Sequence, residues 1–309
     1  MASNQQTTSE KATIVLAGIT GDLGGRIAQS LLAHGANVRA ITRPGTTVDT
    51  INKLKQQGVS IIEADYKSVS ALSKALSGAT CVVSALSGLQ EVILEAQRVL
   101  LYAAVEAGVP RFIPSDYSID FTNLPRGTNR NLDLRQEFSE RLDAAPIAAT
   151  SVLNGMFTDL LTGQAPLVLF PLKRIVYWGD ADQPLDFTTI SDTAAFTAAA
   201  AMDSSTPTPR YLRVAGDTLS ARELREVASA STGKEFQLFR IGGLGTLDLM
   251  IKFTRAIMPQ SNEVFPPWQG MQYLRNMFSG KAKLEHLDND RYPDISWTPV
   301  SEVLAAYKQ

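Results

Sequence analysis

The first 155 residues alternate between two hydrophobic periods, which predict strands that alternate with helices. Short β-branched apolar runs bounded by glycine are typical of strands buried on both faces of a parallel sheet. Such runs occupy residues 12–17, 37–43, 59–64, 79–85, 110–115 and 148–153. Helical apolar spacing fills the intervals at 24–34, 48–57, 68–77, 91–107 and 130–144. Five consecutive strand–helix units predict an α/β fold with a doubly wound parallel sheet.

Glycines mark the ends of four of these predicted helices. Gly35, Gly58, Gly78 and Gly108 each follow a helical pattern directly. A helix commonly ends on a residue in the left-handed conformation, which glycine adopts without steric cost. The four glycines therefore support the predicted helix boundaries.

The alternation changes character after about residue 156. Strand-like runs at 173–178, 184–189 and 210–215 are mixed with helical patterns at 191–203, 220–231, 244–257 and 268–278. We expect three parts: a disordered leader (1–11), a nucleotide-binding domain (12–155) and a smaller mixed α/β C-terminal lobe (156–309). The lobe is expected over the carboxyl ends of the strands, where open α/β sheets bind ligands.

A glycine-rich turn joins the first predicted strand to the first predicted helix. Gly18 can turn the chain sharply, Gly21 leaves room for a pyrophosphate, and Gly24 allows close packing of helix and strand. The helix dipole and free N–H groups would face the phosphates. The spacing Gly-x-x-Gly-x-x-Gly differs from Gly-x-Gly-x-x-Gly, but the position of the turn predicts a Rossmann-type dinucleotide site.

The end of the second strand predicts which dinucleotide is bound. NAD enzymes commonly place a carboxylate there for the ribose 2′-hydroxyl, whereas this chain has Thr42 and Arg43. A guanidinium would pair with a 2′-phosphate, which favours NADP(H). Arg43 as an ordinary surface arginine is the alternative. Asp65, after the third strand, could bind the adenine or cap the following helix.

Small and polar residues follow the next two strands. Ser84 and Ala85 end the fourth strand and would let a ribose lie across the sheet edge. Ser115, Asp116 and Tyr117 end the fifth, where nicotinamide and substrate would meet. Tyr117 can act as an acid and Asp116 as a base or orienting group. The alternative is that Ser115 and Asp116 only begin a loop.

Composition excludes several classes of function. The net charge of −2 and the absence of a basic block argue against nucleic acid as a partner. No run of eighteen uncharged apolar residues predicts a membrane span, and the polar start lacks a signal-peptide core, so we expect a cytoplasmic protein. The lone Cys81 fits a buried strand, and His34 and His286 stand apart, so no metal site is predicted.

Several motifs together resemble the NmrA-like and isoflavone-reductase-like branch of the atypical short-chain dehydrogenases. They are Gly18-Ile-Thr-Gly-Asp-Leu-Gly24, Arg43, Val82-Val-Ser-Ala85, Arg111-Phe-Ile-Pro-Ser-Asp116, Asn154-Gly-Met-Phe157 and Phe187-Thr-Thr-Ile-Ser-Asp192. The resemblance implies NADP(H) bound at Gly18, Thr20, Gly21, Leu23, Gly24 and Arg43, with the nicotinamide near Ser115, Asn154, Met156 and Phe157. It also matches Gln97 to a glutamine of the reductases. A small substrate would lie between the lobes, walled by Tyr117, Phe157 and a mobile stretch at 117–130.

One departure from that family bears on catalysis. Reductases of this branch carry a catalytic lysine in the helix before the sixth strand, and here Arg135 stands at that position. Arginine can hold a carbonyl oxygen but is a poor proton donor. We expect an NADPH-dependent reductase of a small carbonyl or conjugated, including aromatic, compound: Arg135 or Asn154 polarises the acceptor and Tyr117 supplies the proton. The alternatives are a non-catalytic NADP(H) sensor acting through a protein partner and, third, an isomerase or epimerase.

Overall fold

The computed structural model describes residues 11–204, 208–259 and 262–307, and a six-stranded parallel sheet forms its centre. The strand order is β3-β2-β1-β4-β5-β6, which is the doubly wound arrangement predicted from the sequence. The strands are β1 (Thr13–Ala17), β2 (Asn37–Thr42), β3 (Ser60–Glu63), β4 (Cys81–Ser84), β5 (Arg111–Ile113) and β6 (Ala148–Ala149). The predicted leader lies, apart from Lys11, outside the described residues.

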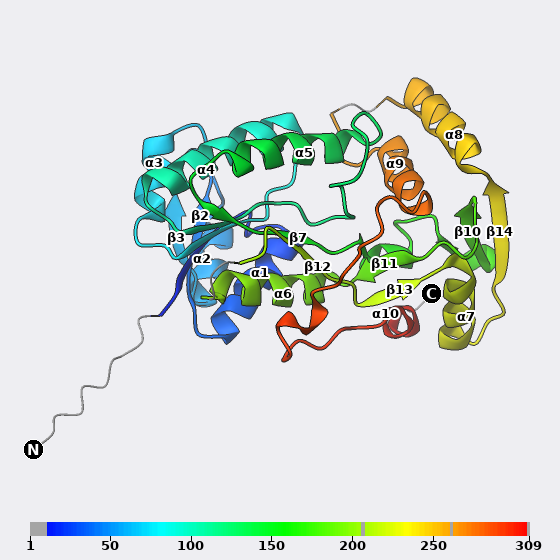
Figure 1. Ribbon diagram of the computed structural model, residues 1–309. Helices are drawn as coiled ribbons and strands as arrows, with labels where there is room; N and C mark the ends of the chain where they lie inside the picture. Colours follow the sequence, from blue (N-terminus) through cyan, green and yellow to red (C-terminus); the bar gives the residue numbers. More distant parts are fainter. Residues whose placement is uncertain (1–10, 205–207, 260–261, 308–309) are drawn as a thin grey trace, which may run out of the picture.

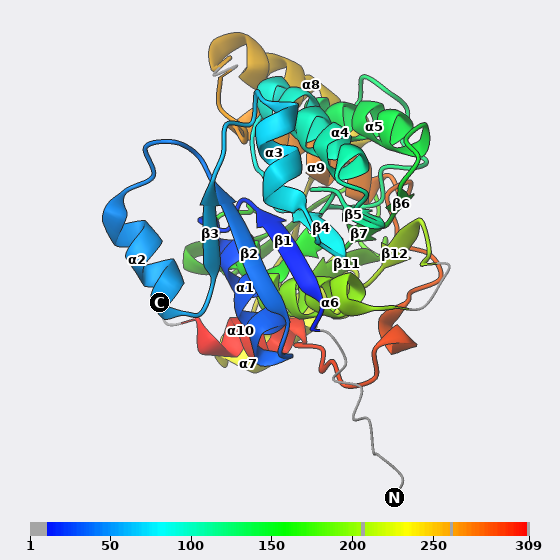
Figure 2. The ribbon, with the colours of Figure 1, turned by 90° about the vertical axis from the view of Figure 1, so that its left-hand side faces the viewer.

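Helices cover both faces of this sheet (Figure 2). One face carries α3, α4 and α5, and the other carries α1 and α6, with a separate apolar core under each layer. The helices are α1 (Asp22–Ala33), α2 (Val48–Gln56), α3 (Val69–Leu76), α4 (Gln97–Glu106), α5 (Arg130–Asp143) and α6 (Ile190–Met202). A π-helical turn, Glu91–Ala96, precedes α4, so the predicted helix at 91–107 has two parts.

The predicted helix-ending glycines adopt the expected conformation. Gly35, Gly58, Gly78 and Gly108 have φ angles of 78°, 90°, 72° and 70°. Side chains with a Cβ rarely adopt this region. The predicted role of these four glycines is confirmed.

The prediction of one continuous strand at 148–153 is wrong, because this segment forms two short strands in different sheets. The N–H of Thr150 still bonds to the carbonyl of Phe112, but the N–H of Ser151 bonds to Arg210 instead. The chain therefore leaves the main sheet, and β7 (Ser151–Leu153) pairs with β12 (Tyr211–Arg213).

The second half forms two small sheets with helices around them (Figure 1). The sheet orders are β14-β10-β9 and β13-β11-β8. The elements are β8 (Met156–Phe157), β9 (Val168–Leu169), β10 (Arg174–Trp178), β11 (Leu185–Thr188), β13 (Asp217–Leu219), β14 (Gln237–Gly242), α7 (Ala221–Thr232), α8 (Leu244–Ile257), α9 (Pro267–Phe278) and α10 (Val300–Ala306). The mixed character was predicted, but β14 and the shortest strands were not.

One helix from the second half of the sequence, α6, packs against the first half of the fold. Helix α6 packs against α1, and Phe196 of α6 belongs to the core cluster that contains Ile27 and Leu31 of α1. Residue 155 therefore does not separate two independent units, because α6 packs with α1 against the main sheet.

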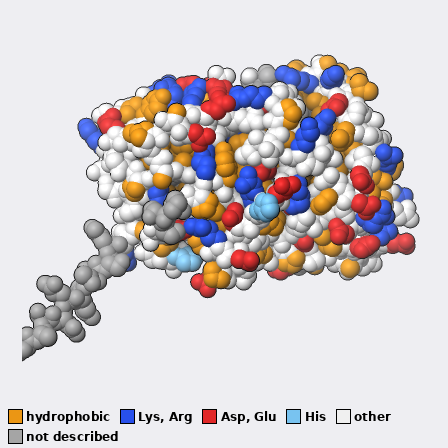
Figure 3. Space-filling model, viewed as in Figure 1, with side chains coloured by type: hydrophobic (Ala, Val, Ile, Leu, Met, Phe, Trp, Pro, Cys, Tyr) orange, Lys and Arg blue, Asp and Glu red, His pale blue; other side chains and the backbone are white. Residues whose placement is uncertain are grey.

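The surface has no strong segregation of charge in the view of Figure 3. Acidic and basic side chains are interspersed there, with hydrophobic side chains between them. Across the described ranges, no helix combines the length and apolar character needed to cross a membrane.

Candidate functional site

The glycine turn lies where β1 ends beside β4. Gly18 has a φ of 89°, and a Cβ on it would lie 2.5 Å from the carbonyl oxygen of Ala85. A Cβ on Gly24 would lie 2.2 Å from the carbonyl oxygen of Gly18. Both contacts are too short for any side chain, so the backbones of β1, β4 and α1 meet only because these residues are glycines.

Gly21 occupies the open side of the same turn. The nearest atom to a Cβ built on it is the carbonyl oxygen of Gly18, at 3.5 Å. Gly21 is also the N-cap of α1 and offers no side-chain cap to the first-turn N–H groups. Thr20 is exposed and Leu23 half-buried beside it. Free N–H groups at an open helix N-terminus suit a phosphate.

Arg43 lies exposed just beyond β2. Its charge acts on Tyr66, whose phenol is mostly buried, and this burial raises the pKa of Tyr66 while Arg43 opposes the rise. The Tyr66 hydroxyl has no hydrogen-bond partner within the described ranges. No sequence pattern singles out Tyr66, because the signal is its proximity to Arg43 in space.

Asp65 lies at the start of the turn before α3. Its carboxylate accepts the N–H of Lys67 at 3.0 Å, while Ser68 caps the helix by accepting the N–H of Ala71. The suggestion that Asp65 caps the helix is therefore wrong. Its side chain is exposed, and Asp65 stays a candidate for the adenine.

The ends of β4 and β5 are fixed by buried hydrogen bonds. The N–H of Ser115 donates to Gln97 Oε1 at 2.8 Å, and Ser115 Oγ donates to the carbonyl of Leu86 at 2.6 Å. Gln97 is fully buried. Ser84 is also fully buried, and its hydroxyl finds no partner in the part of the chain that is described.

Asp116 points away from Ser115 into a polar network under α5. Its Oδ2 accepts the hydroxyl of Ser151 at 2.7 Å, and that hydroxyl also accepts from Arg210 at 2.7 Å. The side chain is fully buried, and burial raises the pKa of Asp116. Asp116 therefore favours its protonated form more than an exposed aspartate does.

Tyr117 lies in the hydrophobic core on the other face of the sheet. It belongs to the cluster that contains Ile14, Val152 and Phe196, and its hydroxyl lies near Thr197 of α6. Burial raises the pKa of Tyr117 well above its ordinary value. The assignment of Tyr117 as proton donor and as substrate wall does not fit this position.

Part of the stretch at 117–130 is packed into the core. Ile119 and Phe121 belong to the core of the second half, and Asp120 forms an ion pair with Arg213 at 2.6 Å. Buried apolar side chains and a buried carboxylate hold this part of the stretch in place, whereas Asn123 and residues 125–127 are exposed. The mobility of the wall stays a prediction.

Arg135 lies on the buried side of α5. Its charge acts on Asp116 and on Tyr273 of α9, which places the guanidinium between the end of β5 and that helix. Its Nη1 donates to the carbonyl of Asn131 at 3.0 Å, while its Nε has no partner in the described residues.

Asn154 carries a fully buried side chain whose amide oxygen and nitrogen both lack partners in the described ranges. Its backbone is fixed instead: the N–H donates to Ser118 at 3.0 Å, and the carbonyl accepts from Thr188 Oγ1 at 2.7 Å. A buried amide with both atoms unsatisfied is costly, and a ligand bearing a donor and an acceptor would satisfy it.

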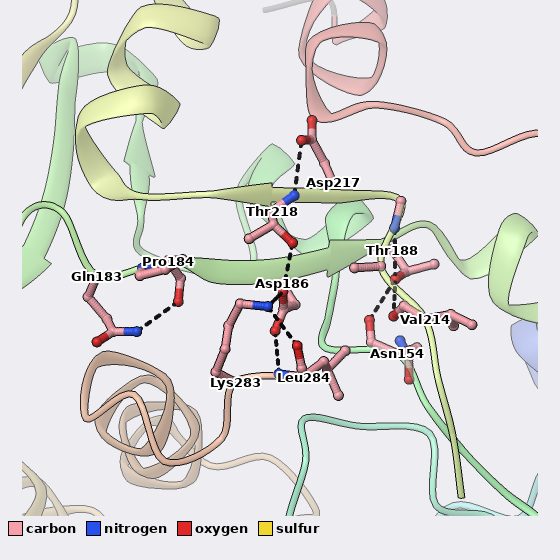
Figure 4. A network of polar contacts seen from close by, with 12 residues as sticks. Asn154, Gln183, Pro184, Asp186, Thr188, Val214, Asp217, Thr218, Lys283 and Leu284 are labelled. Atoms are coloured by element: carbon pink, nitrogen blue, oxygen red, sulfur yellow. Dashed lines mark hydrogen bonds and ion pairs between the residues drawn. The ribbon is translucent and has the colours of Figure 1, made fainter. Parts of the chain in front are cut away.

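The residues after Asn154 are held by a second buried network (Figure 4). Gly155 has a φ of 69°, and a Cβ on it would lie 2.4 Å from the carbonyl oxygen of Asp186. The Asp186 carboxylate accepts from Lys283 Nζ at 2.5 Å, from the N–H of Leu284 at 2.7 Å and from Thr218 at 2.8 Å. Met156 and Phe157 then pair with β11. This network positions Asn154, and sequence reasoning missed it.

Comparison with known proteins agrees with this architecture. A model of the NmrA-like family matches residues 10–265. Pinoresinol reductase 1 of Arabidopsis thaliana is 29% identical over 321 residues, which cover 97% of this chain and 98% of that protein.

Two solved structures share the fold over nearly the whole chain. An isoflavone reductase has a TM-score of 0.82 at 21% identity and covers 97% of this chain and 100% of its own. The AtPrR2 structure with NADP+ and (+)-pinoresinol has a TM-score of 0.78 at 23% identity and covers 97% and 99%. The family expected from the sequence motifs is confirmed: this chain belongs to the NmrA-like family.

Proposed function

We propose that this protein is an NADPH-dependent reductase of a small carbonyl or conjugated compound, with an aromatic compound as the preferred case. The observation that carries the proposal is the glycine turn itself: an uncapped α1 N-terminus opens at Gly21, and Arg43 stands beyond β2. The relatives support it, since they include a pinoresinol reductase and a structure that holds NADP+.

The turn would bind the pyrophosphate at the N-terminus of α1, and Arg43 would pair with the 2′-phosphate, while Thr20 and Leu23 flank the phosphates. Tyr66 and Asp65 would flank the adenine. Ser84, Ala85 and Ser115 would border the ribose and nicotinamide along the sheet edge. Bound NADPH supplies the hydride.

The residues around Asn154 would orient the acceptor. The free amide of Asn154 can donate a hydrogen bond to an acceptor oxygen, and the Arg135 guanidinium would add positive charge near Asp116, at the end of β5. Met156 and Phe157 would give the pocket an apolar wall. Because Tyr117 is in the core and arginine holds its proton at neutral pH, we expect water to protonate the product.

The test is NADPH oxidation followed at 340 nm with a panel of lignans, isoflavones, enones and phenolic ketones. We expect turnover with at least one aromatic substrate and a much weaker rate with NADH. Tight NADPH binding without any turnover across the panel would instead favour the second function, a non-catalytic NADP(H) sensor with a protein partner. Arg135 at the lysine position and the burial of Tyr117 are the observations that favour that alternative.

A further inference from the structure

Arg135 is a buried cation without a counter-ion. It is 9% exposed, and no other arginine or lysine is buried within the described ranges. None of the ion pairs formed by the described residues includes it. Burying an unpaired charge is costly, so a ligand that supplies a negative charge would stabilise this site.

The free groups of Arg135 lie along one edge of the guanidinium. Nη1 is used by the Asn131 carbonyl, while Nε is buried without a partner, and neither it nor Nη2 forms a hydrogen bond to any described residue. The Nε–Nη2 edge presents two parallel N–H donors. A carboxylate matches this edge with its two oxygens in a bidentate pair.

The nearest titratable neighbours leave that edge available. Asp116 Oδ2 accepts from the Ser151 hydroxyl, while its Oδ1 is buried without a hydrogen bond to any described residue and so does not occupy the Arg135 edge. Burial also disfavours the charged form of Asp116. Tyr273 is partly buried against the core, and its desolvation raises its pKa, which disfavours the phenolate. Arg130 is engaged with the carbonyls of Glu263 and Val264 and lies over the Trp268 ring. Arg135 is therefore the one cation of this group, among the described residues, that is available to a ligand. A carboxylate, with one negative charge, would balance it, whereas a dianionic phosphate would bring one charge too many.

We infer that the substrate carries a carboxylate, which Arg135 binds through its Nε–Nη2 edge while Asn154 addresses the acceptor oxygen. The statement that this ligand is the substrate rests on the proposed function. A lysine at this position would offer a point charge; arginine offers a planar fork that selects an acid over a neutral analogue.

The experiment compares acids with their amides by calorimetric titration of the NADP+-loaded protein. The probes are benzoate, cinnamate and 4-hydroxycinnamate, each against its own primary amide, with phenyl phosphate as a further anion. At least one acid should bind about 10- to 100-fold more tightly than its amide, as a charge-assisted bidentate pair implies. Arg135→Gln should abolish this preference, and Arg135→Lys should keep part of it.

Arg141→Gln is the matched control on the same helix, since Arg141 is paired with Glu137. It should leave the preference unchanged. Equal binding of every acid and its amide, or a preference that persists in Arg135→Gln, would overturn the inference. Tighter binding of phenyl phosphate than of any carboxylate would overturn it as well. If Arg135→Gln does not fold, the acid-to-amide ratios of the wild-type protein and of Arg135→Lys still test the inference. The titration involves no turnover, so a protein that selects acids but never oxidises NADPH refutes the proposed reduction alone.

Discussion

The backbone N–H of Ser115 donates to the side-chain oxygen of Gln97 over 2.8 Å, and both residues are buried. A side chain on α4 thus fixes the end of β5, since no other element supplies an acceptor for that N–H in the described structure.

Replacing Gln97 by leucine would keep the volume and remove the acceptor. A buried N–H without a partner costs about 1–3 kcal/mol, so the free energy of unfolding should fall by that amount. Urea denaturation measures the change, and NADP+ affinity should fall with it. Arg98→Leu, an exposed neighbour paired with Glu95, is the control and should change stability little. Unchanged stability in Gln97→Leu would show that the bond is dispensable.

The three glycines of the turn should respond differently to alanine. Gly24→Ala places a Cβ 2.2 Å from a carbonyl oxygen and should reduce the free energy of unfolding by about 3 kcal/mol. Gly21→Ala has space for its Cβ in the ligand-free protein and should fold normally, but it should weaken NADP+ binding roughly tenfold or more. Gly25→Ala, whose Cβ would lie 3.5 Å from its nearest neighbour, is the control. Normal NADP+ affinity in Gly21→Ala would contradict the phosphate site.

Arg43→Ala should weaken NADPH binding about 10- to 100-fold and leave NADH binding almost unchanged, because only NADPH carries the 2′-phosphate. Fluorescence titration with both cofactors measures the two affinities. Lys53→Ala removes an exposed charge from α2 and serves as the control. A parallel loss for both cofactors would mean that Arg43 does not discriminate between them.

The buried Asp116 should make stability depend on pH. Its pKa is raised in the folded protein above the unfolded value of about 3.9, so its stabilising contribution is complete below that value and is lost as pH rises through the folded pKa. Asp116→Asn cannot ionise and should remove this decline. Urea denaturation at several pH values above 4 compares the two proteins, and identical slopes would show that Asp116 is not responsible.

Removing a buried aspartate should lower the free energy of unfolding much more than removing an exposed one. Asp186→Ala removes the acceptor for Lys283, Leu284 and Thr218 and should reduce the free energy of unfolding by about 3–5 kcal/mol. Asp182→Ala breaks only an exposed pair with Arg222 and should have little effect on stability. Thermal unfolding compares them. Similar midpoints would contradict the anchoring role of Asp186.

The strands and the turn could be predicted because each depends on local chemistry. A strand buried on both faces needs an uninterrupted apolar run, and Gly24 is required by a backbone contact with Gly18, six residues earlier. Gly18 is required in addition by the distant carbonyl of Ala85, but its position at the strand-to-helix turn already marked it. The strand β14 was missed although it contains Leu238, Phe239 and Ile241, because a short apolar run does not by itself distinguish a strand from a helix segment. It pairs with β10, a strand 63–64 residues earlier in the chain, and a local pattern does not show that pairing.

The directions of side chains beyond a strand end could not be predicted. Asp116 and Tyr117 are neighbours in sequence, yet one enters the polar network under α5 and the other the core under α6. Helix α6, which begins at Ile190, completes that core far along the chain. The resemblance gave the position of Arg135 on α5, but only its packing reveals the missing counter-ion.

The return of α6 to α1 also limits how this chain can be divided. A fragment that ends at residue 155 would contain every strand of the main sheet but would lose Phe196, leaving the α1 face around Ile27 and Leu31 open to water. Such a fragment should be insoluble or molten, and adding back residues 190–202 as a separate peptide should rescue it. Recombination between relatives should therefore succeed where α1 and α6 are exchanged together.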